Sequence, residues 1–275
     1  MTIALIDNGS LEPAAPRNLR AVAAALSART GASVDAVSWK HSDRIPAAAL
    51  DARSAWTLSP FVRAAVGRGE REFVFVPFFV SAQGAIGSAL RDDLEKLQRE
   101  VDGFDFTFTD GLAARGALTP ILVDRIRAKI SDLGLIDARV IVVDHGGPSP
   151  VSATLRNAVA AEVRSVLGHE IAHLGAASME GEAHAHNRPL FVELLTTPPF
   201  DRGDIVVAPL FLSPGRHAGP QGDLSQIAGT VRRSSTPSAA RCHFADLVGT
   251  HPLAIDTLTT ALRDTLSTLH VQPFA

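Results

Sequence analysis

The sequence of 275 residues lacks several features that would each indicate a particular class of protein. It contains one cysteine and no tyrosine, which excludes an internal disulfide, a cysteine-based zinc site and a phenolic acid. The formal net charge of −3 gives no electrostatic argument for binding nucleic acid or an anionic membrane surface. No apolar run reaches the roughly 18 residues of a membrane span, and the chain starts with a strand-like segment, TIALI. We therefore expect a cytoplasmic protein with neither nucleic acid nor membrane as a partner.

The composition is that of a globular protein, and the chain contains an internal repeat. Hydrophobic residues make up 46% and charged residues 20% of the chain, enough to bury a substantial core. Residues 3–10 (IALIDNGS) match residues 140–147 (VIVVDHGG), and residues 73–81 (FVFVPFFVS) match residues 205–213 (IVVAPLFLS). Because these similarities occur in the same order, we expect a duplicated domain, with halves at 1–134 and 135–275.

Each half alternates strand and helix patterns. Strands are expected near 2–7, 34–39, 72–80, 104–108, 139–144, 170–178, 204–212 and 241–246. Helices are expected near 16–29, 86–100, 118–132, 151–167, 188–196, 223–232 and 252–269, with a helix-prone stretch at 47–50. This alternation predicts an α/β fold of two similar, doubly wound, three-layer lobes with parallel sheets, and a cleft between them.

Two histidines follow strands that are apolar on both faces. His145 ends the run VIVVDH, and His217 follows the run IVVAPLFL after a short SPGR segment. Parallel strands deliver their carboxyl ends to one edge of a sheet, and adjacent strands lie about 4.8 Å apart. Neutral imidazole is a good ligand for first-row divalent metals, so His145 and His217 could meet on one ion. The plainer interpretation is that both residues only cap strand ends through hydrogen bonds.

The two patterns together resemble the CbiX-type sirohydrochlorin chelatases of the class II chelatase superfamily. The resemblance rests on a strand followed by His-Gly-Gly and on a strand followed by Pro-Leu-Phe-Leu-Ser-x-Gly-x-His. It implies insertion of a divalent metal into a tetrapyrrole on the way to cobalamin or sirohaem. The metal is then a substrate, with Co²⁺ first, Fe²⁺ second and Ni²⁺ possible, and no bound cofactor is needed. The resemblance also implies a carboxylate after the second strand, where this chain has Glu180 as an ancillary ligand or proton acceptor.

Residues beside these histidines are candidates for contact with the tetrapyrrole. Gly146 and Gly147 let the backbone turn tightly after the strand and leave room for a large ligand. The loop that begins at Ser213 contains Gly215 and Arg216, whose amides and guanidinium could face the carboxylates of such a substrate. An exposed loop arginine is more often only solvated.

His184 and His186 lie on alternate residues and could face one ion if that segment is extended. They belong either to a metal-delivery or substrate-facing loop, or to a solvated connector.

The first half departs from the chelatase pattern. Asn8 replaces the histidine at the first strand end, Ala85 stands where the second histidine would fall, and Lys40 takes the place of the carboxylate. We therefore expect one metal site per chain, in the second half, in a monomer or homodimer. The alternative function is a non-catalytic metal or tetrapyrrole carrier derived from the same fold.

Overall fold

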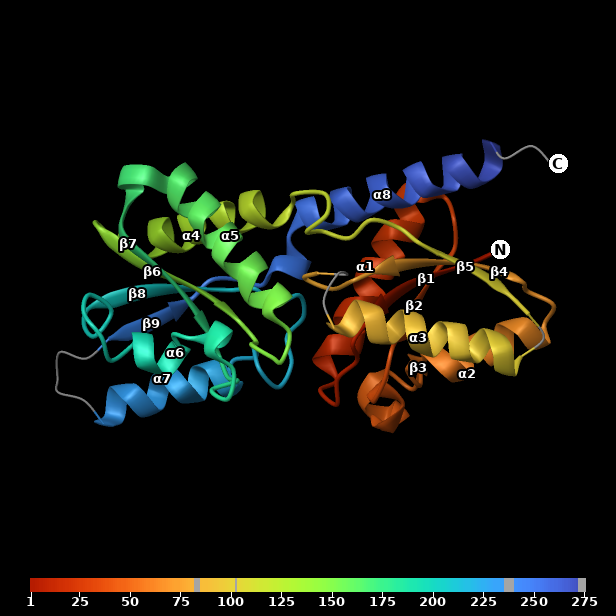
Figure 1. Ribbon diagram of the computed structural model, residues 1–275, viewed down its shortest axis with the longest axis horizontal. Helices are drawn as coiled ribbons and strands as arrows, with labels where there is room; N and C mark the ends of the chain where they lie inside the picture. Colours follow the sequence, from red (N-terminus) through yellow and green to blue (C-terminus); the bar gives the residue numbers. More distant parts are fainter. Residues whose placement is uncertain (82–84, 102, 235–239, 272–275) are drawn as a thin grey trace. The chain divides into compact units, whose positions relative to one another are not determined.

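The computed structural model describes residues 1–81, 85–101, 103–234 and 240–271, and it contains two compact units. Unit 1 comprises Met1–Ala117 and Gly249–Ala275, and unit 2 comprises Leu118–Val248. Each unit has its own sheet, and all strand pairs in the described part of the chain are parallel (Figure 1). The predicted α/β class with two similar doubly wound units is confirmed.

The sheet of unit 1 has five strands in the order β3-β2-β1-β4-β5. They are β1 (Thr2–Asp7), β2 (Val34–Ser38), β3 (Trp56–Thr57), β4 (Glu72–Pro77) and β5 (Asp105–Phe108). β1 lies at the centre, and its residues from Ile3 to Ile6 are almost fully buried. An apolar run without alternation is what a strand covered on both faces requires.

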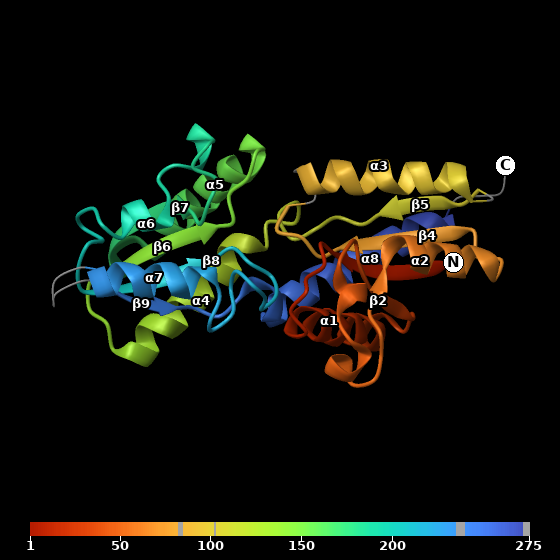
Figure 2. The ribbon, with the colours of Figure 1, turned by 90° about the horizontal axis from the view of Figure 1, so that it is seen from below.

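Four helices cover the two faces of this sheet. They are α1 (Ala14–Thr30), α2 (Leu58–Gly67), α3 (Ala85–Glu100) and α8 (Pro252–Val271). α2 and α3 pack on one face, where Phe61 and Leu94 belong to the same buried cluster as Phe75 of β4. α1 packs on the other face with α8 alongside it, and Figure 2 shows α1 and α3 on opposite sides of the sheet.

Unit 2 repeats this plan with a four-stranded sheet in the order β7-β6-β8-β9. Its strands are β6 (Ala138–Asp144), β7 (Ile171–Ser178), β8 (Asp204–Pro209) and β9 (Arg241–Phe244), and its helices are α4 (Leu118–Leu133), α5 (Pro150–Leu167), α6 (Phe191–Leu194) and α7 (Asp223–Ser234). α6 and α7 share a buried cluster with Ile141 and Val143, whereas α4 and α5 pack together on the opposite face (Figure 1).

The compact units are divided differently from the predicted halves of 1–134 and 135–275. α4, the last helix of the first half, belongs to unit 2, and α8, the last helix of the second half, belongs to unit 1. α4 packs against α5 and β8, and α8 packs against α1. The repeat in the sequence fixes the order of the elements but carries no information about which sheet a final helix covers.

α2 and β3 were not predicted. The sequence analysis placed the helix-prone stretch at 47–50, where the structure has a short 3₁₀ turn. The apolar side chains of α2 nevertheless have helical spacing, since Leu58, Phe61, Val62 and Ala65 are all buried.

The structure bears on two features that the sequence analysis drew from composition, the lack of a membrane span and the single cysteine. In the part of the chain that the structure describes, no helix is both long and apolar enough to cross a membrane. Burial raises the pKa of the Cys242 thiol to about 12, so this side chain is protonated near neutral pH.

Candidate metal centre

The structure brings His145 and His217 together at one edge of the unit 2 sheet. His145 follows β6 and His217 follows β8, and these strands are neighbours in the sheet. Their Nε2 atoms are 3.3 Å apart, and the ring planes are nearly perpendicular, at 85°. Phe211 lies beside both rings, at centroid distances of 6.4 Å from His145 and 6.5 Å from His217. The two imidazoles predicted from the strand ends therefore do lie face to edge, with Nε2 facing Nε2.

The partners of the other ring nitrogens determine what the facing atoms can do. His145 Nδ1 lies 2.8 Å from the Gly146 carbonyl oxygen, and His217 Nδ1 lies 2.7 Å from Asp223 Oδ2. A carbonyl and a carboxylate only accept, so each Nδ1 carries the proton and donates it. A ring that carries its one proton at Nδ1 has a lone pair at Nε2, and the two Nε2 atoms face each other. Two lone pairs 3.3 Å apart repel each other unless a proton or a metal cation lies between them.

Glu180 joins this pair from the third strand end. It follows β7, and its amide donates to the His145 carbonyl, which extends the pairing of β6 and β7 beyond the strands. Glu180 Oε1 lies 3.5 Å from His145 Nε2. Within the described residues, no three His, Cys, Asp or Glu side chains form a group that could hold an ion together. The arrangement is thus a pair of imidazoles with an adjacent carboxylate rather than a closed cage.

The three side chains are accessible. The side chains of His145, His217 and Glu180 are 45%, 32% and 55% exposed, respectively. A structural metal site is normally enclosed by four ligands, whereas an open one leaves positions for an exchanging ligand. The exposure of this cluster fits the open type.

Gly146 and Gly147 have different roles in the loop after β6. Gly146 has φ +83°, and a Cβ atom there would lie 2.1 Å from the Glu180 carbonyl oxygen, so only glycine allows the two chain segments to approach. Gly9 of unit 1 is in the same situation against the Lys40 carbonyl, at φ +85°. Gly147 has open space at the Cβ position, which is compatible with the predicted room for a ligand.

The segment with His184 and His186 braces this loop. His186 Nε2 lies 2.9 Å from the Gly147 carbonyl oxygen, and the fully buried Asn187 donates to the Gly147 and Gly181 carbonyls. The ring of His184 stacks on that of His186 at a centroid distance of 5.4 Å. One nitrogen of His186 is thus engaged in holding the backbone. Asn187 could not be predicted from the sequence, because a buried asparagine is recognised only by its partners.

Beneath His145 lies a buried ionic network that was also not predicted. Asp144, 7% exposed, accepts from the Ser178 hydroxyl at 2.7 Å and pairs with the Arg156 guanidinium at 3.3 Å. Arg156 is 1% exposed and also donates to Ser178. Because Asp144 directly precedes His145, this network fixes the backbone from which the imidazole projects.

Unit 1 has the same carboxylate without the arginine. Asp7 ends β1 as Asp144 ends β6, and the buried positions of α1 and α5 match when Leu19 is placed opposite Arg156. Burial raises the pKa of Asp7 to about 6, against the opposing effect of hydrogen bonds from Ser38 and the Gly9 amide. Among the described residues, no cation offsets this loss of solvation.

We expect Asp7→Asn to stabilise unit 1 at neutral pH. A carboxylate whose pKa rises from 3.8 to about 6 on folding costs almost nothing below pH 3.8, progressively more between these two pKa values, and a constant amount above pH 6. The full cost is on the order of 3 kcal/mol. Chemical denaturation from pH 4 to 8 should show a stability gain for Asp7→Asn above pH 6 that vanishes near pH 4. An equal gain at both ends, or in the exposed control Asp105→Asn, would refute this cause.

The loop from Ser213 to Gly222 positions His217. Gly219 donates its amide to the Gly215 carbonyl, and the amides of Asp223 and Leu224 donate to the carbonyls of Arg216 and His217. The Arg216 side chain is 78% exposed and lies 3.6 Å from Asp223 Oδ2. Its predicted contact with a carboxylate-rich substrate stays a prediction, as do those of Ser213 and Gly215.

Asp223 is a residue of this cluster that the sequence did not indicate. It begins α7, and its carboxylate holds His217 Nδ1. We expect Asp223→Asn to weaken cobalt binding by about 10- to 100-fold, because an amide can donate to Nδ1 and shift the proton to Nε2. Cobalt titration gives the affinity, and the ¹⁵N shifts of His217 report the protonated nitrogen. An unchanged tautomer with unchanged affinity would exclude this role, and Asp223→Glu should retain most of the affinity.

The corresponding positions of unit 1 carry different chemistry. Asn8 is exposed at the end of β1, and Lys40 lies after β2 with its ammonium 3.4 Å from Asp93 Oδ2. Ala85 begins α3, and its side chain lies outside the described residues. An amide and a paired ammonium offer no counterpart to the imidazole pair of unit 2.

Comparison with known proteins identifies the fold. No protein-family model matches the chain, and no curated protein matches it in sequence. SirB from Bacillus subtilis with Fe³⁺ superposes with a TM-score of 0.67 at 13% identity, over 99% of this chain and 98% of that one. The sirohydrochlorin chelatase SirB from Bacillus subtilis subspecies spizizenii with cobalt gives 0.65 at 14% identity, over 99% and 98%. CbiX, described as the terminal enzyme of siroheme biosynthesis in denitrifying bacteria, gives 0.60 at 14% identity, over 96% and 99%.

These similarities show that nearly the whole chain has the fold of the sirohydrochlorin chelatases. The predicted resemblance is confirmed at the level of the fold.

Proposed function

We propose that this protein inserts a divalent metal ion into sirohydrochlorin or a closely related tetrapyrrole. The observation that carries the proposal is the pair of Nε2 atoms 3.3 Å apart, in two rings whose Nδ1 atoms each lie within hydrogen-bond distance of an oxygen acceptor. Such a pair accepts a metal cation and can release it to a better set of ligands. The fold shared with SirB and CbiX supports the same reaction class.

The chemistry needs a weakly held ion and a proton acceptor. Two imidazole ligands leave most coordination positions free, so pyrrole nitrogens can enter before the imidazoles leave. The macrocycle loses two N–H protons as the metal enters, and an imidazole that has released the ion is a suitable base near neutral pH. In this proposal Glu180, 3.5 Å from His145 Nε2, contributes a further oxygen ligand or accepts a proton.

The proposal also concerns which metal ion is inserted. We rank Co²⁺ first, Fe²⁺ second and Ni²⁺ third. Imidazole and carboxylate ligands bind all three, so the ligand types alone do not separate them. The neighbouring structures contain Fe³⁺ in one case and cobalt in another.

A carrier is the second candidate function. What favours it is that the described residues form no group of three metal-binding side chains, so the pair would hold an ion without transferring it. A carrier and an enzyme differ in stoichiometry rather than in binding.

The test is turnover. Sirohydrochlorin in about tenfold excess over protein is mixed with Co²⁺, and the absorbance change is compared with the rate without protein. An enzyme converts all of the tetrapyrrole faster than the uncatalysed reaction. A carrier stops at one equivalent, and that result would overturn the chelatase proposal.

A further inference from the structure

The loop after β6 contains a peptide unit whose orientation bears on which ring nitrogen of His145 is protonated. His145 Nδ1 lies 2.8 Å from the carbonyl oxygen of Gly146. This carbonyl and the Gly147 N–H belong to one planar peptide unit and point in opposite directions. Glycine on both sides restricts the rotation of this unit less than any other pair of residues would, because neither has a Cβ atom. The direction of the carbonyl therefore depends on contacts from elsewhere in the chain.

The side chain of Asn187 provides these contacts. The Gly147 N–H donates to Asn187 Oδ1 at 3.3 Å, and Asn187 Nδ2 donates to the carbonyls of Gly147 and Gly181, each at 3.0 Å. The opposite orientation of the side-chain amide would place its oxygen against two carbonyl oxygens, so the network determines which atom is Oδ1. Asn187 is fully buried, and its side chain is shielded from competing water.

Asn187 also joins the two loops that supply the imidazole and the carboxylate. Gly181 directly follows Glu180, and the contact is close, since a Cβ atom at Gly181 would lie 2.2 Å from Asn187 Nδ2. One side chain thus bonds to the loop after β6, which carries His145, and to the loop after β7, which carries Glu180.

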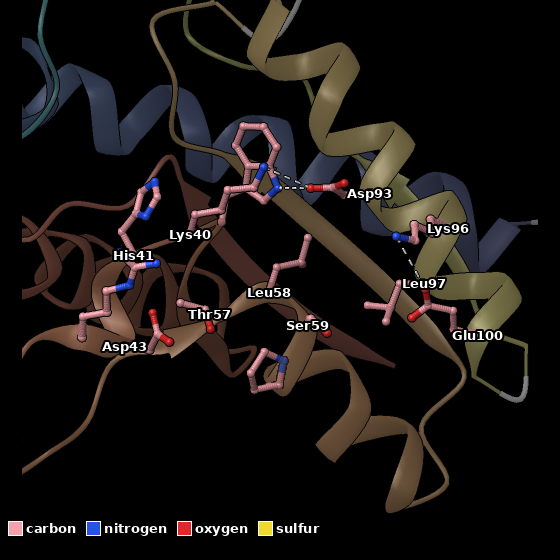
Figure 3. A pocket seen from close by; sticks show the side chains of 13 residues that line it. Lys40, His41, Asp43, Thr57, Leu58, Ser59, Asp93, Lys96, Leu97 and Glu100 are labelled. Atoms are coloured by element: carbon pink, nitrogen blue, oxygen red, sulfur yellow. Dashed lines mark hydrogen bonds and ion pairs between the residues drawn. The ribbon is translucent and has the colours of Figure 1, made fainter.

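Unit 1 contains the same kind of clamp without the imidazole pair. Ser10 is the counterpart of Gly147 in the repeat, and its N–H donates to Ser42 Oγ at 3.1 Å. The Ser42 hydroxyl donates to the Ser10 carbonyl at 3.1 Å, and Ser42 is fully buried. The segment after β2, which contains Ser42, presents Lys40 paired with Asp93 (Figure 3). Ser42 is therefore a matched clamp beside a strand end that has no histidine.

We propose that Asn187 is a positioning residue that sets the tautomer of His145. By holding the Gly147 N–H, it directs the Gly146 carbonyl at Nδ1, and a proton on Nδ1 leaves the Nε2 lone pair for a metal ion. A histidine ring in water favours the proton on Nε2, where it would occupy the metal-binding nitrogen. The consequence for metal insertion rests on the proposed function, whereas the tautomer itself does not.

Nuclear magnetic resonance of the metal-free protein tests this role. At about pH 8, where unperturbed imidazoles are neutral, long-range ¹H–¹⁵N spectra should show the His145 proton on Nδ1 in the wild type. Asn187→Ala should move most of it to Nε2, whereas His217, which Asp223 holds, should keep its proton on Nδ1. Asn187→Asp should retain the wild-type tautomer, because a carboxyl oxygen still accepts from the Gly147 N–H.

Ser42→Ala is the matched control. It removes an equally buried clamp and should lower stability, yet it should leave the tautomer of His145 unchanged. In the insertion assay, Asn187→Ala should weaken cobalt binding and lower kcat, each by about tenfold. The KM for sirohydrochlorin should not change, because the buried side chain does not reach the substrate. A tautomer shift in Asn187→Ala, together with a wild type that shows no turnover, would refute the proposed function and leave the positioning role intact.

Three results would overturn the positioning role: a His145 proton that stays on Nδ1 in folded Asn187→Ala, equal changes at His145 and His217, or the same shift in Ser42→Ala. If Asn187→Ala does not fold, Asn187→Asp decides alone, and a His145 proton on Nε2 in that variant contradicts the assignment.

Discussion

Replacing His145 and His217 together by alanine is expected to lower the rate of cobalt insertion into sirohydrochlorin by about a thousandfold or more. The two Nε2 atoms are the only facing pair that the described residues place at this edge, and Glu180 alone offers one weak ligand. Both imidazoles are partly exposed, so their removal leaves no cavity in the core. The fold of unit 2 should therefore persist, which circular dichroism and thermal unfolding can verify.

A matched control is His173→Ala. His173 is an exposed residue of β7 in the same unit, and its loss should leave insertion unchanged. Wild-type turnover in the double variant would show that the imidazole pair is not the metal site.

The second large effect concerns stability. Arg156→Leu is expected to destabilise unit 2 by about 3–5 kcal/mol, because it leaves the buried Asp144 carboxylate without its cation. Leucine is the side chain that unit 1 has at the matching position, Leu19, and there the carboxylate of Asp7 responds with a raised pKa. Native-state hydrogen exchange of the β6 amides measures the change without assuming that both units unfold together.

The double variant Asp144→Asn/Arg156→Leu separates charge from packing. If the unpaired charge causes the loss, the neutral amide should recover a large part of it at pH 7. Equal destabilisation of the single and double variants would assign the loss to the packing of the guanidinium instead.

Most of the strand pattern was predictable because strands buried on both faces are apolar without alternation. β1, β6 and β8 lie within one residue of their predicted starts, and the approach of His145 to His217 follows from the adjacency of β6 and β8. The sequence predicts only that parallel strands deliver their carboxyl ends to one edge of the sheet, and the structure shows that β6 and β8 are neighbours there.

The features that could not be predicted from the sequence depend on contacts between residues that are distant in sequence. Asp223 has no signal in the sequence, because its contact with His217 requires the loop to fold back onto that histidine. Arg156 lies on the buried face of α5, where helical spacing predicts an apolar side chain. The matching residue of α1, Leu19, is apolar. The exchange of α4 and α8 between the units depends on packing against a particular sheet, which helical periodicity alone does not specify.

We propose that one metal site exists per chain and that it lies in unit 2. Unit 1 has Asn8 at the end of β1 and, after β2, Lys40, whose ammonium is engaged with Asp93. A cation at that edge repels a divalent ion.

Anomalous scattering from cobalt-soaked crystals tests this claim most directly. We predict one strong peak between His145 Nε2 and His217 Nε2, on the side of Glu180, and its loss in the double alanine variant. A strong peak beside Asn8 and Lys40, with none between His145 and His217, would contradict the account.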